Sequence, residues 1–497
     1  MLRGEWGVVL LVATLKLLLP VLSNGQYDFH RDELAVLDDA RNLAWGYVAY
    51  PPLTPFVARL ALLVFGPSVV GLRLFSALSQ SLATVLGGLI ARELGGKRLA
   101  IVLAAVVVAI APVSMAMSTL FEYTAFDYLW WVLISYLFVR LLKSDDGRWW
   151  LGIGAAIGLG ALTKYAIAFL VVGIAVGLLA TRARRYLLTG WFWGGVAVAL
   201  LIFLPNLVWQ VQHQFISLSF LLSIHGRDVQ NGRTSEYLVD QLRLAANPFT
   251  IPLWILGLNF LFFSEAGRRY RMLGWLSVAP IVLLFLSQGR GYYAAPAYPL
   301  LLAAGSVSLE GWLKTSGPVA RRLTETVGVV MVATGTLIVL ALGPFAPVDS
   351  PLGGFARGLN TDLGAEVGWH SLAAEVGRIY GALPDRTTAT VAVLAGNYGE
   401  AGALDLYRSR YGLPRIISGV NSYWARGYGA PPPQTLIVVG FDRADATRYF
   451  GTCDLAGHNT NRYGIANEET TDDPDIFVCR NPRANWPQLW SELRSFG

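Results

Sequence analysis

Charged residues are scarce in this sequence of 497 residues, in which Asp, Glu, Lys and Arg together make up 14%. Hydrophobic residues make up 54%, and the mean hydropathy is +0.48. A soluble domain has about 25% charged residues, because its surface must be wetted by water. The composition therefore excludes soluble, disordered and fibrous classes and indicates a membrane protein.

Histidine and cysteine are also rare, with five and two residues. The histidines are scattered, and no Cys/His spacing resembles a zinc site. The net charge of +6 comes from short basic clusters between apolar runs rather than from one basic surface, which excludes nucleic acid as a partner. No internal repeat of the kind common in secondary transporters is visible.

What the sequence does contain is a set of long runs without any charged residue. Each is about long enough for a helix that crosses ~30 Å of hydrocarbon. They cover residues 99–121, 186–212, 244–264, 272–289, 291–309 and 327–348. We therefore expect a mainly α-helical polytopic membrane protein and exclude a β-barrel.

The basic clusters predict the orientation, because Lys and Arg concentrate on the cytoplasmic side. The clusters are Arg92/Lys97/Arg98, Lys143/Arg148, Arg182/Arg184/Arg185, Arg268/Arg269/Arg271 and Arg321/Arg322. One topology of about eleven spans makes all of them cytoplasmic, together with Arg3, and places the C-terminus outside. Its spans are expected at 7–22, 69–91, 99–117, 124–142, 149–163, 166–181, 187–210, 248–263, 272–288, 293–309 and 327–343. A cleaved signal peptide over residues 1–25 is the alternative, but Val21-Leu22-Ser23 is a poor cleavage site.

Composition changes near Gly343, after which Gly, Pro, Asp, Asn and Arg become frequent. We expect a transmembrane domain over residues 1–343 and a small extracytoplasmic α/β domain over 344–497. Strands are predicted at Ala389–Ala395, Arg415–Ser418, Thr435–Phe441 and Asp475–Cys479, with helices at Glu400–Tyr411, Asp442–Phe450 and Pro487–Phe496. Cys453 and Cys479 both lie here, as a disulfide or as two buried thiols.

The first outside segment, residues 23–67, is too long for a simple connection. Apolar residues from Leu34 to Ala44 follow helical spacing, so Asp32 and Glu33 fall in the first turn of an amphipathic helix near the membrane surface. Acidic residues favour a helix N-terminus for electrostatic reasons alone, and this interpretation stays open.

Several ionisable residues lie within or next to predicted spans, where each costs a few kcal/mol unless it serves a function or is paired. Near the outer side these are Lys16, Arg73, Asp127 and Lys164, together with Arg290, Tyr292 and Tyr293 between two spans. Carboxylates beside several cations at one membrane interface suit a lipid-borne phosphate and a reacting hydroxyl. Snorkelling or structural pairing is the alternative for each of them.

The ordered motifs resemble the GT-C glycosyltransferases, specifically the polyprenyl-phosphate-sugar-dependent family that includes protein O-mannosyltransferases and the lipid A aminoarabinose transferase (glycosyltransferase family 39). The motifs are Asp32-Glu33, Tyr50-Pro-Pro-Leu, Arg73-Leu-Phe-Ser, Phe126-Asp-Tyr-Leu-Trp-Trp, Leu162-Thr-Lys-Tyr, Leu204-Pro-Asn-Leu, Asn247-Pro and Gly291-Tyr-Tyr-Ala-Ala-Pro. The resemblance covers most of residues 8–310. It implies transfer of a sugar from a polyprenyl phosphate to an acceptor hydroxyl, with inversion, on the extracytoplasmic face of the plasma membrane of a prokaryotic cell.

The resemblance also implies roles for single residues. Asp32 is expected to be the general base, supported by Glu33, with Asp127 as a second acid facing the same site. Lys164, Arg290, Tyr292 and Tyr293 are expected to bind the leaving phosphate. Weaker candidates for the phosphate are Lys16, Arg73, Arg59, His225 and Arg227; Arg59 or Arg73 would replace a cation that relatives carry near Tyr50.

The sequence leaves four points open. No cofactor is required by it, but a divalent metal ion bridging Asp32, Asp127 and phosphate is compatible with it. The acceptor is a glycan, a lipid or a protein. The motif Asn397-Tyr-Gly-Glu serves either the acceptor or a strand-to-helix turn. A membrane transporter or receptor with an outer ligand-binding domain is the alternative to the enzyme.

Overall fold

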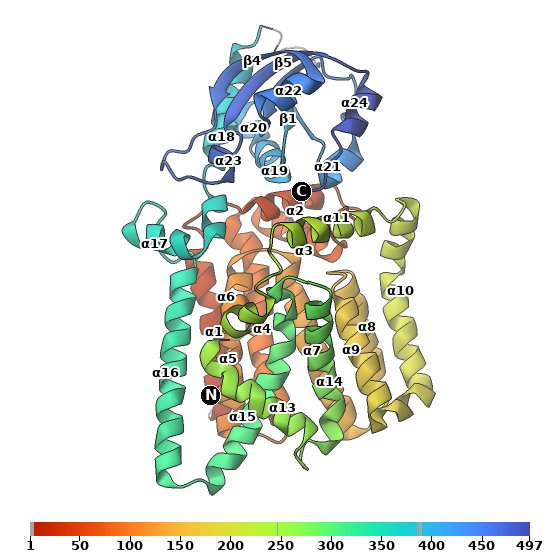
Figure 1. Cartoon of the computed structure of the whole chain (residues 1–497), viewed down its shortest axis with the longest axis vertical. Helices are drawn as coiled ribbons and strands as arrows, with labels where there is room; N and C mark the ends of the chain where they lie inside the picture. Colours follow the sequence, from red (N-terminus) through yellow and green to blue (C-terminus); the bar gives the residue numbers. More distant parts are fainter. Residues whose placement is uncertain (1–3, 246, 385, 387–389) are drawn as a thin grey trace.

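The computed structural model of the chain describes residues 4–245, 247–384, 386 and 390–497. A bundle of long helices forms one part, and an α/β domain sits on one end of it (Figure 1). The bundle helices are α1 (Glu5–Ser23), α4 (Val69–Glu93), α5 (Arg98–Ala109), α6 (Pro112–Thr119), α7 (Tyr123–Ser144), α8 (Trp149–Ala161), α9 (Ile167–Ala180), α10 (Gly190–Gln212), α13 (Ile251–Phe262), α14 (Arg271–Leu286), α15 (Tyr298–Thr315) and α16 (Pro318–Leu342).

Shorter helices lie between these or at their ends. They are α2 (Arg31–Arg41), α3 (Leu53–Phe65), α11 (Ile216–Gln230), α12 (Tyr237–Asp240) and α17 (Pro351–Leu359), a π-turn η2 (Gln241–Ala245), and the 3₁₀ turns η1 (Arg182–Leu188), η3 (Pro248–Thr250), η4 (Arg268–Tyr270), η5 (Gly291–Ala297) and η6 (Thr361–Glu366). Helices α2, α3 and α11 lie across the end of the bundle that faces the α/β domain (Figure 1).

Within the described ranges, six helices are long and apolar enough to cross a membrane, or up to nine if each of three bent pairs counts as one span. The predicted spans fall on helices; the span predicted at 124–142, for example, is α7. The span predicted at 99–117 is bent by 57° between α5 and α6. The prediction of about eleven spans also includes shorter helices such as α8, so the number of spans stays a prediction.

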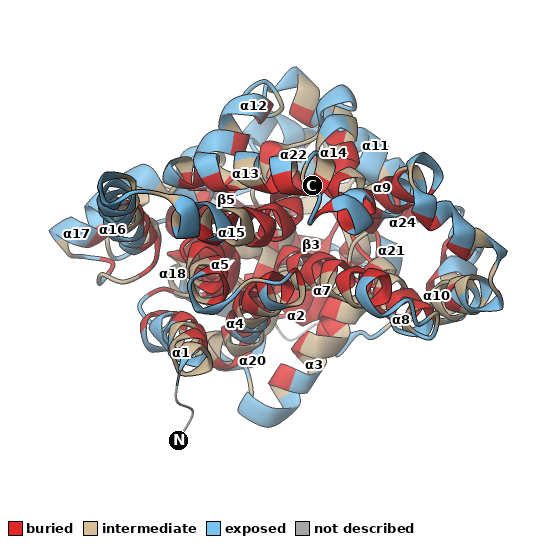
Figure 2. Ribbon diagram, turned by 90° about the horizontal axis from the view of Figure 1, so that it is seen from below, coloured by how far each residue is buried: buried red, intermediate tan, exposed pale blue. Residues whose placement is uncertain are grey.

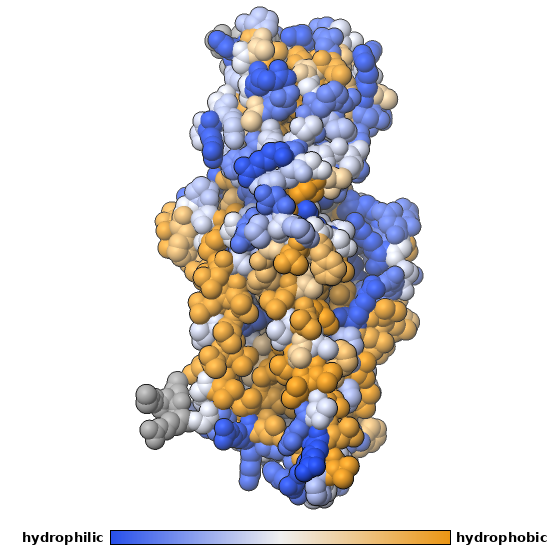
Figure 3. Space-filling view, turned by 90° about the vertical axis from the view of Figure 1, so that its left-hand side faces the viewer, coloured by the Kyte–Doolittle hydropathy of each residue, from blue (hydrophilic) through white to orange (hydrophobic). Residues whose placement is uncertain are grey.

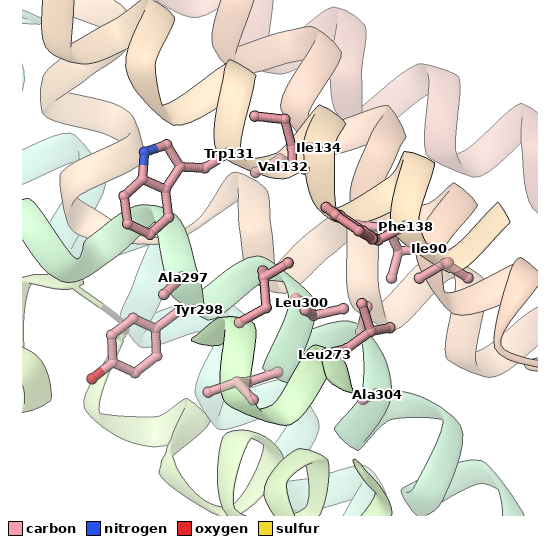
Figure 4. Close-up of a cluster of buried hydrophobic side chains, with 14 of the residues drawn as sticks. Ile90, Trp131, Val132, Ile134, Phe138, Leu273, Ala297, Tyr298, Leu300 and Ala304 are labelled. Atoms are coloured by element: carbon pink, nitrogen blue, oxygen red, sulfur yellow. The ribbon is translucent and has the colours of Figure 1, made fainter. Parts of the chain in front are cut away.

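The core of the bundle is packed from apolar side chains of α4, α7, α14 and α15. Trp131 and Phe138 of α7 lie near Leu273 of α14 and Leu300 of α15 (Figure 4), and all four are buried. Seen from below, burial is concentrated in these central helices, whereas α10 and α16 are exposed on their outer sides (Figure 2). The bundle is therefore held together by apolar side chains packed in its interior, and its outer surface is apolar as well.

Small residues let α13 and α15 approach closely. A Cβ atom at Gly257 would lie 2.0 Å from the carbonyl oxygen of Leu301, and one at Gly305 would lie 1.8 Å from that of Leu253. Helix pairs in membranes commonly pack through such residues, because apolar side chains gain little by leaving lipid.

The surface of the bundle carries a broad apolar zone, with polar residues above and below it (Figure 3). Exposed leucines of α10, such as Leu200, Leu201 and Leu204, contribute to apolar surface of this kind. The α13–α14 and α15–α16 connections lie at the end of the bundle opposite the α/β domain (Figure 1), and two of the basic clusters lie in or directly beside them. A bundle with this surface suits a lipid bilayer.

The α/β domain contains one five-stranded sheet in the order β2-β1-β3-β5-β4. Strands β1 (Val391–Ala395), β2 (Arg415–Ser418) and β3 (Thr435–Val439) are parallel, whereas β5 (Asp475–Pro482) and β4 (Phe450–His458) are antiparallel. Its helices are α18 (Trp369–Ala382), α19 (Tyr398–Leu406), α20 (Arg408–Tyr411), α21 (Asn421–Arg426), α22 (Arg443–Tyr449), α23 (Glu468–Thr471) and α24 (Trp486–Glu492).

Four of these strands lie where the sequence predicts them, whereas β4 and α18 were not predicted. The predicted strand start at Ala389 and the predicted cytoplasmic Arg3 lie outside the described residues. A disulfide joins Cys453 of β4 to Cys479 of β5, which are opposite each other in the ladder.

The apolar side of the helix predicted in the outside segment packs against protein. Leu34, Leu37 and Ala40 of α2 are buried in a cluster that includes Leu372 and Leu404 of the α/β domain. The apolar side of α2 is therefore covered by protein, and this helix links the bundle to the sheet domain.

Candidate active site

Helix α2 begins with a capping box that separates the roles of its two acids. The His30 ring accepts a hydrogen bond from the backbone N–H of Asp32, and the backbone N–H of His30 donates to Glu33 Oε2 over 2.8 Å. The side chain of Glu33 is completely buried, whereas that of Asp32 is 36% exposed. Only Asp32 of the predicted pair faces outwards.

Glu33 and Arg73 form a buried ion pair. Arg73 Nε donates to Glu33 Oε1 over 2.8 Å and Nη2 to Oε2 over 2.7 Å, while Nη1 donates to Glu366 over 3.1 Å. Glu33 also accepts from the backbone N–H of Phe121. The pair therefore ties α2 to α4 in the interior, and the roles predicted for Arg73 at the phosphate and for Glu33 in support of Asp32 stay predictions.

Glu122, which the sequence analysis did not single out, is the acid next to Asp32. Asp32 hydrogen-bonds with Glu122 and accepts a 2.7 Å bond from the Tyr398 hydroxyl. Burial raises the pKa of Asp32, but His30, Glu122 and Tyr398 together outweigh it and bring the pKa below its ordinary value. Asp32 is therefore held as the ionised member of the pair.

Burial raises the pKa of Glu122 strongly, and the neighbouring Asp32 charge raises it further. Two close carboxyl groups that share a proton behave in this way, because both cannot ionise cheaply together. Glu122 is thus the protonated member. Its signal in the sequence is its position, since it directly precedes the apolar span that carries Phe126-Asp-Tyr.

Asp127 does not join this pair. It is buried within α7, and its Oδ1 accepts a 3.1 Å hydrogen bond from Trp131 Nε1. It interacts electrostatically with Lys164. Asp127 therefore adjoins the lysine of the site and not its carboxyl pair, and its predicted role as a second acid stays a prediction.

Lys164 lies between α8 and α9 against three tyrosine rings. Its Nζ is 3.9 Å from the ring centre of Tyr293, 5.4 Å from that of Tyr123 and 5.7 Å from that of Tyr292. Tyr123 follows Glu122 in the chain and interacts electrostatically with both Glu122 and Asp32. The carboxyl pair and the lysine therefore both lie close to Tyr123, and we call Asp32, Glu122, Tyr123, Lys164 and Tyr293 the Asp32 site.

Arg290 is paired rather than open. Its Nε and Nη2 donate to the two Asp228 oxygens over 2.6 and 2.8 Å, and the Asp228 side chain is only 6% exposed. The pair joins the stretch before η5 to α11. Arg290 therefore positions Tyr292 and Tyr293, two and three residues later, and its predicted contact with phosphate would require Asp228 to release it.

The remaining predicted cations are dispersed. Lys16 is buried in the bundle, where its ammonium donates to the Ala109 carbonyl over 3.0 Å, and its predicted phosphate role stays a prediction. Arg59 is half-buried on α3, and His225 and Arg227 are exposed on α11. No interaction in the described residues connects these three with the Asp32 site.

His30, Asp32 and Glu122 each offer one ligand atom, and these atoms lie within 4.8 Å of one another. A nitrogen with two carboxylate oxygens suits a divalent cation once the shared proton has left. Among the described residues Asp127 is not part of this group, and the predicted metal pair of Asp32 and Asp127 stays a prediction.

A family model described as dolichyl-phosphate-mannose-protein mannosyltransferase matches residues 49–209. The lipid A galacturonosyltransferase RgtD of Rhizobium johnstonii is 28% identical over 60% of this chain and 64% of its own length. The lipopolysaccharide core galacturonosyltransferase RgtA of the same organism is 28% identical over 45% of this chain and 50% of its own. The chain thus spans about half to two thirds of the length of these relatives.

Solved structures agree on the fold. ArnT from Cupriavidus metallidurans in the apo state aligns with a TM-score of 0.59 at 15% identity, covering 95% of this chain and 97% of that one. The same protein bound to undecaprenyl phosphate gives 0.55 at 16% identity over 95% and 98%. The chain therefore has the fold of ArnT, and its residues 49–209 are similar to the dolichyl-phosphate-mannose-protein mannosyltransferase family.

Proposed function

We propose that the protein is an inverting glycosyltransferase that moves a sugar from a polyprenyl-phosphate donor to an acceptor hydroxyl. The observation that carries the proposal is the Asp32 site, in which a carboxylate with a lowered pKa and an ammonium group both lie close to one tyrosine. Such a transfer needs a base on one side of the anomeric carbon and a cation on the other.

Asp32 is the proposed general base. As the acceptor oxygen attacks the anomeric carbon, its proton passes to the Asp32 carboxylate, and the bond from the anomeric carbon to the phosphate oxygen breaks. Because attack and departure take place on opposite faces in one step, the anomeric configuration inverts. Glu122, held protonated, keeps a second negative charge away from the acceptor and orients Asp32.

Lys164 is the proposed partner of the leaving phosphate. Charge grows on the phosphate as the bond breaks, and a fixed ammonium stabilises that charge more than it stabilises the ground state. The three rings hold Lys164 in place, and the hydroxyl groups of Tyr292 and Tyr293 are further donors close to it.

The substrates follow from the setting of the site. A lipid-linked donor reaches the Asp32 site from the membrane, since the bundle below it is apolar on its surface. The relatives named above act on lipid A and on the lipopolysaccharide core, which favours a glycolipid acceptor over a protein. We place the enzyme in a prokaryotic plasma membrane with the α/β domain outside. The relatives give no support to the transporter or receptor alternative.

The test is transfer by the purified protein in liposomes. The donors are undecaprenyl phosphates carrying galacturonic acid, aminoarabinose or mannose, and the acceptor is lipid A. Asp32→Asn keeps the size of the side chain but removes its basicity, so transfer should fall by about a hundredfold or more. Binding of undecaprenyl phosphate should be unchanged. Near-native transfer by Asp32→Asn would remove Asp32 as the base, and lack of transfer with all donors by the unaltered protein would contradict the substrate class.

A further inference from the structure

Tyr398 connects the α/β domain to the Asp32 site. It is the first residue of α19, and its hydroxyl donates to Asp32 Oδ1 over 2.7 Å across a separation of 366 positions. The domain lies directly above α2 (Figure 1). A side chain of the outer domain therefore touches the proposed base.

Two glycines of α19 allow this contact. A Cβ atom at Gly402 would lie 2.8 Å from the Leu34 backbone, and one at Gly399 would lie 2.7 Å from Arg31 Cβ. Any larger residue at these positions would push α19 away from α2. The motif Asn397-Tyr-Gly-Glu, for which the sequence left an acceptor role and a turn open, thus also contributes to this contact, because the small residues of α19 bring Tyr398 within hydrogen-bonding reach of Asp32.

The direction of Tyr398 is fixed by its neighbours in the chain. The Asn397 side chain caps α19 by accepting a hydrogen bond from the backbone N–H of Glu400 over 2.9 Å. The Glu400 carboxylate in turn accepts a hydrogen bond from the backbone N–H of Asn397, which completes a capping box. Close by, Trp369 Nε1 donates to the Phe29 carbonyl over 2.8 Å. The first turn of α19 and the segment before α2 are therefore tied together on both sides of the tyrosine.

We propose that Tyr398 is a positioning residue of the transferase, and that the α/β domain completes the active site through it. By holding Oδ1, Tyr398 leaves Asp32 Oδ2 as the oxygen that meets the acceptor hydroxyl. His30, whose Nδ1 is 3.6 Å from Oδ2, and Glu122 are the other groups around this carboxylate, with Arg31 next to it in the chain. This inference rests on the proposed function of Asp32.

The test replaces the hydroxyl alone. Tyr398→Phe should lower kcat by about ten- to a hundredfold, the effect of losing one hydrogen bond to a charged group, with the Kd of undecaprenyl phosphate unchanged. In an Asp32→Asn background the same change should have no further effect on transfer, because its partner is already altered. Additive losses in the two backgrounds would overturn the proposal.

Tyr407→Phe is the matched control. Tyr407 also belongs to the α/β domain, and its hydroxyl donates to a carboxylate of the same segment, Asp28, over 2.9 Å. Its removal should change thermal stability about as much as Tyr398→Phe does and should leave kcat near the native value. An equal loss of kcat in both variants would show that Tyr398 acts only by docking the domain.

A measurement without turnover separates this inference from the proposed function. Cysteines at positions 32 and 398, with the native disulfide kept, should be joined by a short bis-methanethiosulfonate in the full-length protein. A pair at positions 32 and 407 should be joined much less. Failure of the first pair would overturn the placement of Tyr398 even if no donor were transferred, whereas cross-linking with a fully active Tyr398→Phe variant would overturn only its role.

Discussion

Glu33 and Arg73 are bound side by side in the interior, with both carboxylate oxygens of Glu33 occupied by the guanidinium over 2.7 and 2.8 Å. Glu33 follows Asp32 directly, yet the two acids face different surroundings. One closes a buried ion pair between α2 and α4, and the other lies at the proposed site of transfer. Adjacent acids in a helix point about 100° apart, which is enough to separate structure from chemistry.

The first prediction concerns this pair. Glu33→Gln leaves the buried Arg73 charge with only Glu366 to balance it, and breaking a buried pair typically costs about 3–5 kcal/mol. We expect a clear fall in thermal stability in detergent, measured by intrinsic fluorescence. Among molecules that stay folded, the transfer rate should change far less than in Asp32→Asn. A stable but inactive Glu33→Gln protein would instead give Glu33 a catalytic role.

The second prediction separates Glu122 from Asp32. Glu122→Gln copies the protonated state that burial and the Asp32 charge favour, so transfer should fall by no more than about tenfold. Glu122→Ala removes the hydrogen bond to Asp32 and should be worse. Transfer assays with and without a chelator complete the comparison. If Glu122→Gln abolishes transfer and Mn²⁺ restores the unaltered enzyme after chelation, His30, Asp32 and Glu122 hold an essential metal ion.

How much of this site the sequence predicts depends on the range of each interaction. Asp32 and Lys164 could be predicted, because each breaks an otherwise apolar or amphipathic pattern in its own segment. Tyr398 could not, since nothing local indicates that α19 lies on α2. The two buried ion pairs could not be predicted either. Arg73, which pairs with Glu33, and Arg290, which pairs with Asp228, look like unpaired cations in the sequence.

The fold shows the same division. Apolar patterns predict the long helices and the parallel strands: β1 and β3 are short, fully buried runs, and β2 is buried over its second half. Strand β4 was missed because, as an edge strand, it is exposed at five of its nine residues and lacks an apolar run. Helix α2 was predicted, but the burial of its apolar side was not, because that side packs against a domain that is distant in the sequence.

The third prediction distinguishes two cations. Lys164→Ala should weaken binding of undecaprenyl phosphate by about ten- to a hundredfold, the scale of one charge-assisted contact. Arg290→Ala should act mainly on stability, since it leaves the buried Asp228 with only the longer 3.8 Å contact to Arg233 among the described residues. Combining Arg290→Gln with Asp228→Asn should recover that stability. Equal losses of binding in Lys164→Ala and in the neutral double variant would return Arg290 to the phosphate site.

The fourth prediction uses the contact between α2 and α21. Arg426 binds both Asp38 and Asp39, with the Asp39 contact at 2.9 Å. Burial raises the pKa of Asp38 to about 7, with Arg426 opposing the shift and Asp39 adding to it. Because this pKa is raised on folding, the stability that Asp38 contributes is complete below about pH 4 and is lost as the pH rises through 7.

Two variants test this dependence. Arg426→Gln removes the positive charge that opposes the rise in the pKa of Asp38. The melting temperature of this variant should therefore fall further below that of the native protein at pH 8 than at pH 5. Asp38→Asn removes the titrating group and should flatten the profile between these values. A loss in Arg426→Gln that is the same at both pH values would show that the two carboxylates do not control the docking of α2.

The last prediction concerns the side of the membrane on which the chemistry takes place. Cysteines introduced at Arg184 and Asp454 lie on exposed residues at the two ends of the molecule, and the native disulfide is inert to a maleimide. Since basic connections stay on the cytoplasmic side, an impermeant maleimide added to intact cells should label position 454 and not position 184. Permeabilised cells should label both, which controls for reactivity. Labelling of position 184 in intact cells, without position 454, would place the Asp32 site on the cytoplasmic face, and the donor would then be used on the side where it is made.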